Sequence, residues 1–186
     1  MSRCLVVSGP PCAGKSTLAA LLAARFDWPL LSKDVYKEQI FRRLGASDRD
    51  WSRRVSLLAW DLLLSQAEGI LARGHDCVLE GNFRAAQAEV LARLAAVPGT
   101  HFFEVECRAA KHVLLERYRR RAVDGTRHPG HVDLEALPEI EREFDAAPGP
   151  LLAAHGTVLV WDTTRGFDSA PLVQALEALL ARGAAQ

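Results

Sequence analysis

Gly9, Gly14, Lys15 and Ser16 are spaced in a way that suits the binding of a phosphate chain, and they closely follow the apolar run 4–7. Glycine allows backbone angles that other residues resist, so successive main-chain N–H groups can turn inward around an anion. The lysine can reach the β- and γ-phosphates of a nucleotide, and the serine hydroxyl can bind Mg²⁺. We therefore predict a phosphate-binding loop formed by Gly9, Pro10, Pro11, Cys12, Ala13, Gly14, Lys15, Ser16 and Thr17.

Asp34 follows a second apolar run, 29–32, which we predict to be a strand. The carboxyl ends of parallel strands share one edge of a sheet, so Asp34 and Lys15 are expected at the same edge. A carboxylate there could accept the proton of a hydroxyl group that attacks the γ-phosphate. The alternative is that Asp34 only caps the helix predicted from Val35, a common role of aspartate. Lys37, one helical turn later, could face the same cleft or lie in solvent.

A third group of polar residues lies at the end of the predicted strand Cys77–Glu80. Glu80 could lie near Mg²⁺ through a water molecule, because Mg²⁺ keeps several waters in protein sites. Asn82 and Arg84 could hydrogen-bond an acceptor molecule. Arg84 could equally be a surface residue in the first turn of the next helix.

The fifth predicted helix carries a run of arginines that leads into the polar segment Val123–Asp133. Arg117 and Arg121 are four residues apart and share a helix face, so both could address one ligand. Arginine binds phosphate oxygens through a fixed fork of donors, whereas the plain alternative is a solvated basic face. We predict a lid over about residues 117–133 that closes over the nucleotide, with Arg127 as a further basic group.

Charge and composition limit the classes of partner. The chain has 186 residues, with 23 Lys and Arg against 23 Asp and Glu, so its formal net charge is zero. This balance argues against broad, charge-driven binding of nucleic acid, although it allows local basic patches. One such patch spans the second and third predicted helices and could attract an anionic acceptor or simply keep that face in water. It consists of Arg42, Arg43, Arg49, Arg53 and Arg54.

Short apolar strands alternate with helical stretches, which is typical of a parallel sheet covered by helices on both faces. We predict a single α/β domain over residues 1–186, and we expect Val55, Leu58, Leu62 and Leu63 of the third helix to face inward. The predicted strands lie near Cys4–Ser8, Pro29–Ser32, Cys77–Glu80, Phe102–Glu106 and Val158–Trp161. The predicted helices are about Ser16–Phe26, Val35–Leu44, Asp48–Ala72, Ala85–Ala96, Ala109–Ala122, Leu134–Ala146 and Pro171–Arg182.

The sequence also indicates a cellular compartment. No apolar run approaches the roughly 20 residues of a membrane span, and the first strand begins too early to leave room for a signal peptide. The cysteines Cys4, Cys12, Cys77 and Cys107 are dispersed, and three of them fall in predicted strands, where a reduced thiol behaves as a small apolar group. We expect a cytoplasmic protein without disulfides and without a membrane partner, whose oligomeric state the sequence leaves open.

With these residues in place, the chain resembles the P-loop kinases around polynucleotide kinase, chloramphenicol phosphotransferase and zeta toxin. The resemblance covers most of the chain and rests on the loop Gly9–Thr17, Asp34 after the second strand, the strand end Leu79–Phe83 and the arginine-rich lid ending at His131. It implies a P-loop NTPase fold with a five-stranded parallel sheet in the order 2-3-1-4-5, flanked by helices, and a helical lid.

The resemblance also implies roles for the site residues. In such kinases the aspartate after the second strand activates the acceptor hydroxyl, and here that residue is Asp34. The arginine that opens the lid helix packs near adenine, which corresponds to Arg117. A lid arginine reaches the phosphates, which corresponds best to Arg121, with Arg127 as the rival. Lys15 and Arg121 would thus join Asp34 in catalysis.

The sequence departs from the family pattern near the expected acceptor. Lys37 stands where polynucleotide kinases carry an arginine three residues after the aspartate, and a lysine lacks the two-pronged grip of arginine. Glu80 stands where a Walker B aspartate would end the third strand. The segment after it lacks the Asp-Gly-Phe-Pro-Arg pattern of adenylate kinases.

We therefore expect a kinase that uses ATP and Mg²⁺ and moves the γ-phosphate to a hydroxyl group of a small molecule. One alternative is a kinase for 5′-hydroxyl ends of nucleic acids, which the two arginine clusters favour and the neutral net charge disfavours. Another is an ATP-binding regulatory module without transfer chemistry, in which Asp34 is only a cap. The residues expected to contact the acceptor are Asp34, Lys37, Asn82 and Arg84.

Overall fold

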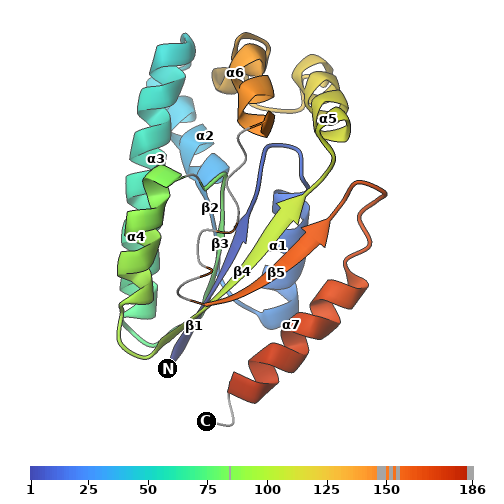
Figure 1. Cartoon of the computed structure of the whole chain (residues 1–186). Coiled ribbons are helices and arrows are strands. Elements are labelled where there is room, and N and C mark those ends of the chain that lie inside the picture. The colour runs from blue at the N-terminus through green and yellow to red at the C-terminus, as the bar shows by residue number, and fades with distance from the viewer. Residues whose placement is uncertain (84, 146–149, 151–152, 154–155, 184–186) are drawn as a thin grey trace.

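Parallel strands form the centre of the molecule (Figure 1). The computed structural model describes the whole chain except residues 84, 146–149, 151–152, 154–155 and 184–186. Among the described residues, five strands follow the order β2-β3-β1-β4-β5, which confirms the order that the resemblance implies. The strands are β1 (Ser2–Ser8), β2 (Leu30–Ser32), β3 (Cys77–Glu80), β4 (Thr100–Arg108) and β5 (Thr157–Asp162).

The helices agree with the predicted ones to within a few residues at each end. α2 begins at Lys33 rather than at Val35, so Asp34 lies inside its first turn. α3 follows Asp48, whose carboxylate accepts a hydrogen bond from the main-chain N–H of Trp51 and so caps the helix. The helices are α1 (Lys15–Phe26), α2 (Lys33–Leu44), α3 (Arg49–Leu71), α4 (Ala85–Ala95), α5 (Lys111–Asp124), the 3₁₀ helix η1 (Pro129–His131), α6 (Asp133–Asp145) and α7 (Ala170–Gly183).

Helices cover both faces of the sheet, α1 and α7 on one face and α3 and α4 on the other (Figure 1). Because side chains alternate along a strand, Leu5 and Val7 of β1 pack with α1 and α7, whereas Cys4 and Val6 pack with α3 and α4. All four side chains are buried. This explains why the strand is a continuous apolar run, as is typical of a parallel strand that is buried on both faces.

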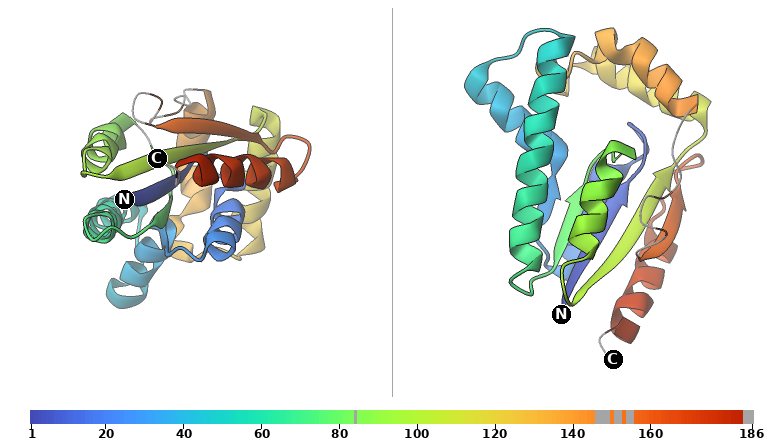
Figure 2. Two further views of the ribbon diagram at one scale, coloured as in Figure 1. Left: turned by 90° about the horizontal axis from the view of Figure 1, so that it is seen from below. Right: turned by 60° about the vertical axis from the view of Figure 1, so that its left-hand side comes forward.

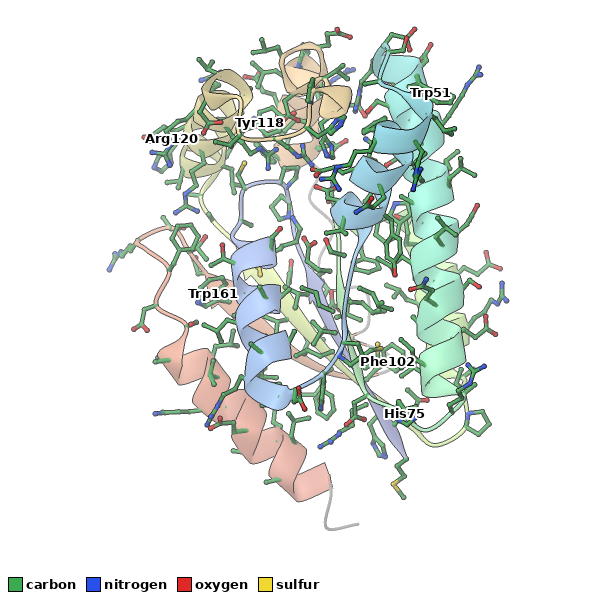
Figure 3. The ribbon with its side chains drawn as sticks, turned by 180° about the vertical axis from the view of Figure 1, so that it is seen from behind. Trp51, His75, Phe102, Tyr118, Arg120 and Trp161 are labelled. Carbon is green, nitrogen blue, oxygen red and sulfur yellow. The ribbon has the colours of Figure 1, made fainter. Side chains whose placement is uncertain are left out.

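The helices α5 and α6 lie beyond the carboxyl ends of the strands, at the opposite end of the molecule from the start of β1 and the end of α7 (Figure 2). Tyr118 of α5 and Trp51 of α3 lie at this end, and His75 lies at the other (Figure 3). The predicted irregular segment Val123–Asp133 is shorter in the structure, because α5 extends into it and α6 begins at its last residue. The segment expected to form the lid therefore consists of the second half of α5, η1 and the start of α6.

The inward face of α3 differs from the prediction. Val55 and Leu63 are fully buried, as expected, but Leu58 and Leu62 keep 48% and 47% of their surface exposed. The buried residues of α3 recur every four positions from 55 to 71, and Leu58 and Leu62 lie on the neighbouring stripe of the helix. The prediction was wrong for these two residues because apolar character alone does not determine which stripe meets the sheet.

The four cysteines are unpaired, as the sequence predicts. Cys4 of β1 and Cys77 of β3 are register partners on adjacent strands, and both are fully buried. Burial raises the pKa of Cys4, so its thiol stays protonated and packs as a small apolar group. In the described part of the chain, no helix combines the length and the apolar character that crossing a membrane requires.

Replacing each of two neighbouring leucines by alanine should distinguish the buried stripe of α3 from the exposed one. Leu63→Ala removes a fully buried side chain, so we expect a loss of about 2–5 kcal/mol in the free energy of unfolding. Leu62→Ala removes a side chain of the same size from the exposed stripe, and we expect a change within about 0.5 kcal/mol. Urea unfolding followed by circular dichroism measures both values. Equal losses would contradict the assignment of the inward face.

Candidate active site

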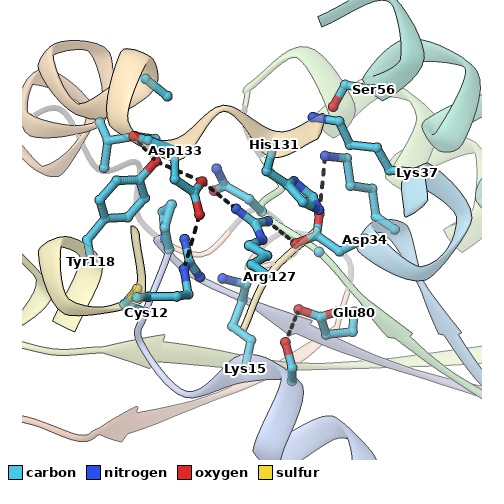
Figure 4. Close-up of a pocket in the computed structure, with 18 of the residues that line it drawn as sticks. Cys12, Lys15, Asp34, Lys37, Ser56, Glu80, Tyr118, Arg127, His131 and Asp133 are labelled. Carbon is cyan, nitrogen blue, oxygen red and sulfur yellow. Dashed lines mark hydrogen bonds and ion pairs between the residues drawn. The ribbon is translucent and has the colours of Figure 1, made fainter. Parts of the chain in front are cut away.

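A pocket of about 610 Å³ lies where the carboxyl ends of the strands meet the lid segment. The phosphate loop and the first turn of α1 contribute one side, α2 and α3 a second, and α5 with the lid segment a third. Open α/β sheets bind their ligands at this edge. The pocket brings together side chains that the sequence singled out, among them Lys15, Asp34, Lys37 and Arg127 (Figure 4). Arg121 lines the same pocket.

The phosphate loop has a shape that glycine permits at two positions. Gly9 has a φ of 126°, and a Cβ atom there would lie 2.2 Å from the main-chain oxygen of Cys107 on β4. Gly14 has a φ of 92° and is the N-terminal cap of α1, and a Cβ atom there would lie 2.7 Å from the ring of Phe167. The loop therefore packs directly on β4 and leads into the N-terminus of α1, where an anion is favoured.

Lys15 and Glu80 lie close together at the base of the pocket (Figure 4), and Ser16 lines the same pocket. Lys15 is buried, and its Nζ donates a hydrogen bond to the carbonyl oxygen of Pro10 at 2.8 Å. Burial lowers the pKa of Lys15, and the charge of Glu80 opposes this shift. Glu80 accepts hydrogen bonds from Ser16 Oγ at 3.2 Å and from Ser32 Oγ at 2.6 Å. The β3 carboxylate thus orients the hydroxyl group that the sequence predicts to bind Mg²⁺.

These groups fit Mg²⁺ that is bound together with a phosphate chain. Mg²⁺ prefers oxygen ligands and keeps several waters, so it needs only one or two protein groups beside the phosphates. Ser16 and Glu80 supply such oxygens. The described residues include no group of three or more His, Cys, Asp or Glu that could hold a metal ion on its own. Ser16 and Glu80 would therefore share the ion with phosphate oxygens and water.

Arg121 presents unsatisfied hydrogen-bond donors at this pocket. Its Nε and Nη2 atoms are buried and have no hydrogen-bond acceptor among the residues that the structure describes. Its guanidinium lies 4.9 Å from the centre of the Tyr118 ring, and Nε lies 3.5 Å from Oδ2 of Asp133. A buried donor without an acceptor costs roughly 1–3 kcal/mol, and phosphate oxygens would remove that cost. The orphaned donors therefore indicate an anion site.

Arg117 is held against the phosphate loop and β5. Its Nη1 donates to the carbonyl oxygen of Cys12 at 3.4 Å and to Oγ1 of Thr163 at 3.0 Å, and its Nη2 donates to the main-chain oxygen of Thr163 at 2.7 Å. Its guanidinium lies 4.5 Å from the centre of the Phe167 ring. Arg119, in contrast, is exposed and pairs with a glutamate of α6. The arginine run is thus divided between the pocket and a solvated face.

Arg127 connects the lid segment to the first turn of α2. It forms ion pairs with Asp34 and with Asp133, the latter at 2.7 Å (Figure 4). Asp133 is almost buried and also accepts a hydrogen bond from the hydroxyl of Tyr118 at 3.0 Å. Arg127 is therefore occupied by two carboxylates, whereas Arg121 keeps donors for a ligand. Of these two arginines, Arg121 is the one with buried donors that lack an acceptor among the described residues.

Asp34 is an accessible, ionised carboxylate on the wall of the pocket. The N-cap position of α2 belongs to Ser32, and no side chain caps this helix, so the interpretation of Asp34 as a cap is wrong. Burial alone would raise the pKa of Asp34, but the charges of Arg127 and Lys33 outweigh it and hold this pKa well below its usual value. The side chain keeps 40% of its surface exposed. A hydroxyl group in the pocket could therefore reach it.

Lys37 is buried between α2 and α3, so it is not a solvated surface lysine. Its Nζ donates a hydrogen bond to Ser52 Oγ at 2.8 Å and lies 5.4 Å from the centre of the Phe41 ring. Only 3% of its surface is exposed. Burial, together with the charge of Lys33, lowers the pKa of Lys37 from 10.5 to about 7.

Two residues that follow β3, Asn82 and Arg84, were expected to contact an acceptor. Asn82 lines the pocket, whereas Arg84 lies outside the described residues. Trp60 of α3 is almost buried and lines the same pocket. A Cβ atom at Gly81 would lie 2.6 Å from the Trp60 ring, so the absence of a side chain lets the end of β3 pack closely on α3.

The structure divides the second basic cluster. Arg49 and Arg53 line the pocket, and both bind Glu139 of α6, at 2.7 Å and 3.1 Å. Glu139 therefore joins α3 to α6, the helix that begins at the end of the lid segment. The arginines that point to solvent instead are Arg42, Arg43 and Arg54.

Several residues of this site were not predicted from the sequence. Ser52 and Ser56 of α3 line the pocket beside Lys37, and their spacing of four, which places them on one helix face, was the available signal. Asp133 and Thr163 gave no local signal. Asp133 contacts a tyrosine 15 positions away, and Thr163 donates to the phosphate loop from 150 positions away.

Comparisons with known proteins find relatives over most of the chain. A family model described as an AAA domain matches residues 5–147. The adenylate kinase of Bifidobacterium longum (strain NCC 2705) is 34% identical over 161 residues, which cover 80% of this chain and 83% of that protein.

Solved structures of kinases are also similar to this chain. A candidate kinase from Chloroflexus aurantiacus J-10-fl is 35% identical, with a TM-score of 0.82 over 95% of this chain and 97% of that chain. A gluconokinase from Sinorhizobium meliloti 1021 is 18% identical and shares the fold, with a TM-score of 0.55 over 96% of this chain and 95% of that chain.

Lys37→Met should stabilise the protein in a pH-dependent way. The pKa of Lys37 falls from 10.5 in the unfolded chain to about 7 in the folded one, so the unfolded state binds more protons between these values. The wild type therefore carries the full penalty below pH 7 and loses it as the pH rises toward 10. We expect a gain for Lys37→Met on the order of 2–4 kcal/mol at pH 6 that shrinks toward pH 10.

Thermal unfolding across this pH range measures the difference. Lys111→Met is the matched control, because Lys111 is an exposed lysine that pairs with Asp145 outside the pocket. It should show no such pH-dependent gain. A gain for Lys37→Met that did not change between pH 6 and pH 10 would contradict the burial of an ammonium group here.

Proposed function

The chain belongs to the AAA-domain family of P-loop kinases, and from that membership we propose that it transfers the γ-phosphoryl group of ATP to a hydroxyl group of a small molecule. The observation that carries this proposal is the meeting of three groups in one pocket. The ammonium group of Lys15, the unsatisfied donors of Arg121 and the carboxylate of Asp34 all line it. The first two suit a phosphate chain, and the third suits an incoming alcohol.

The phosphate loop and its lysine would hold the nucleotide. The loop amides and the N-terminus of α1 favour the β- and γ-phosphates, and Lys15 would leave the carbonyl of Pro10 to bind them. Ser16 and Glu80 would hold Mg²⁺, which would neutralise charge on the phosphate oxygens. The stack of Arg117 on Phe167 offers a planar surface at the pocket edge, which supports the proposal that adenine binds there.

Asp34 would receive the acceptor. Its low pKa keeps it ionised at neutral pH, so it can accept a hydrogen bond from the hydroxyl and take the proton as the oxygen attacks. A weak base suffices, because phosphoryl transfer depends mostly on positioning and charge neutralisation. The new P–O bond forms to the acceptor oxygen, the bond to the β-phosphate oxygen breaks, and ADP leaves.

The lid segment would complete the site. Arg121 would pair with the transferring phosphoryl group, since its donors are not satisfied by the protein. Arg127 would hold Asp34 in place through its ion pair. Closure of α6 onto α3 through Glu139 would exclude water, which otherwise competes as the acceptor.

The adenylate kinase relative supports a second candidate, in which the acceptor is the phosphate of a nucleoside monophosphate. A phosphate acceptor has no proton to lose, however, and would give the Asp34 carboxylate no task. Three expectations stay predictions. They are membership of the group around polynucleotide kinase, chloramphenicol phosphotransferase and zeta toxin, action on 5′-hydroxyl ends of nucleic acids, and a cytoplasmic location. The free thiols support the last of these, because they suit a reducing compartment.

Lys15→Ala should weaken ATP binding by about tenfold or more and reduce transfer by at least about 10²-fold, because the ammonium group would contact the phosphates. Calorimetric titration with ATP and an assay of ADP release measure the two effects. Lys111→Ala serves as the control, since this lysine lies outside the pocket. Unchanged turnover in Lys15→Ala would contradict the phosphate-loop assignment.

Asp34→Asn should lower acceptor-dependent ADP release by about 10²–10⁴-fold while ATP affinity changes little, because the amide cannot take the proton. Asp61→Asn, an exposed position on α3, is the matched control and should behave like the wild type. The panel should include simple alcohols, AMP and a 5′-hydroxyl oligonucleotide. Wild-type release that never exceeds the water-only background would support an ATP-binding module instead, and phosphorylation of AMP by Asp34→Asn at the wild-type rate would favour the phosphate acceptor.

A further inference from the structure

We propose that the acceptor alcohol also carries an anionic group, a carboxylate or a phosphate, which binds Lys37 in a subsite between α2 and α3. The proposal rests on the proposed function, because it names the class of alcohol that the same pocket would take. The subsite consists of Lys37, the hydroxyl groups of Ser52 and Ser56, and the neighbouring Arg49.

The position of Lys37 points to a ligand. Its side chain is buried at the end of the pocket formed by α2 and α3, which we call the acceptor end because Asp34 lies there. Its one described hydrogen bond goes to the neutral hydroxyl of Ser52. No described carboxylate lies within ion-pair distance of its Nζ. Buried ammonium groups are normally paired, since burial without a partner is costly. Figure 4 shows Lys37 on the same side of the pocket as Asp34 and Ser56.

The surrounding charges leave Lys37 without compensation. Burial is the largest cause of its lowered pKa, and the charges of Lys33, Arg127 and Arg49 lower that pKa further, while Asp34 opposes them. Asp34 is itself shared by Arg127 and Lys33. The acceptor end therefore carries excess positive charge, which an anion would balance.

The spacing of Asp34 and Lys37 limits the size of the acceptor. The two residues are three positions apart on α2, so their Cβ atoms lie roughly 5–6 Å apart on one helix face. A hydroxyl group at Asp34 and an anionic group at Lys37 would then belong to the same small molecule, separated by a few bonds. Hydroxy acids and phosphorylated polyols have these dimensions.

A purely structural role for Lys37 makes a different prediction. Its contacts with Ser52 and Phe41 could serve only to join α2 to α3. In that case its removal would lower the melting temperature and affect neutral and anionic acceptors alike. A binding role instead predicts a selective loss for anionic acceptors in a protein that is at least as stable as the wild type.

The experiment compares acceptors in matched pairs with the full chain, ATP and Mg²⁺. The pairs are glycerol against glycerate, glucose against gluconate, and glycerol against glycerol phosphate. The variants are Lys37→Met, which removes the charge, Lys37→Arg, which keeps it, and Lys111→Met, which removes a lysine charge outside the pocket. Transfer is measured as acceptor-dependent ADP release, and the phosphorylated product is identified by mass spectrometry.

We expect the wild type to use an anionic acceptor with a kcat/KM at least about tenfold above that of its neutral partner. Lys37→Met should lose most of this preference, mainly through a higher KM, and Lys37→Arg should keep part of it. Lys111→Met should behave like the wild type. Comparing kcat/KM for glycerate and gluconate with kcat/KM for glycerol phosphate tells whether the subsite prefers a carboxylate or a phosphate.

Binding gives a second readout that does not depend on turnover. The protein is saturated with Mg²⁺ and a non-hydrolysable ATP analogue and titrated with glycerate or glycerol phosphate in two buffers of different ionisation enthalpy. An anion at Lys37 raises the pKa of that lysine, so binding should take up protons, and this uptake should be absent in Lys37→Met.

The proposal is overturned if neutral and anionic partners are used equally, if Lys37→Met keeps the wild-type preference, or if no anionic member is either bound or phosphorylated. The proposed function fails separately, when no alcohol of any charge raises ADP release above the water-only background. Turnover restricted to neutral alcohols overturns the anionic subsite alone.

Discussion

The close approach of Gly9 to β4 is the constraint on which the rest of the site depends. No Cβ atom fits between this residue and the main-chain oxygen of Cys107, so the phosphate loop lies directly on the end of the strand. From that position the loop starts α1, places Lys15 beside Glu80 and determines where the lid segment has to meet it. The site is therefore built directly on the edge of the sheet, and the buried strands hold its groups in position.

The sequence predicts the parts of this molecule that depend on local spacing. The central strand β1 is an apolar run because both of its faces are buried, and the phosphate loop is a contiguous motif, so both could be found without coordinates. The strand order came from the family resemblance. Contacts between distant positions could not be found in this way, since the ion pair of Arg127 with Asp34 joins residues 93 positions apart. The inward stripe of α3 was missed for a related reason, because only the neighbouring sheet selects it.

The described carboxylates of the pocket wall are largely shared between cations. Glu139 binds two arginines of α3, and Asp133 contacts both Arg121 and Arg127. These shared carboxylates hold the lid segment in place without neutralising the pocket as a whole. Lys15 lies outside those ion pairs, and Arg121 keeps two buried donors without a hydrogen-bond acceptor among the described residues despite its contact with Asp133. A net positive interior of this kind suits a triphosphate and its acceptor. Burial is the main cause of the lowered pKa of Lys15 and Lys37, and neighbouring positive charges lower the pKa of Lys37 further.

Arg117 bonds at once to the carbonyl of Cys12 in the phosphate loop and to Thr163 at the end of β5. These bonds anchor α5 near its midpoint, and the C-terminal half of the helix leads to the segment that carries Arg127. A rearrangement of the loop that displaced the carbonyl of Cys12 would have to break this contact of Arg117 or shift α5 with it. Arg117 is therefore a direct physical connection between the phosphate loop and the helix that precedes Arg127 and its ion pair with Asp34.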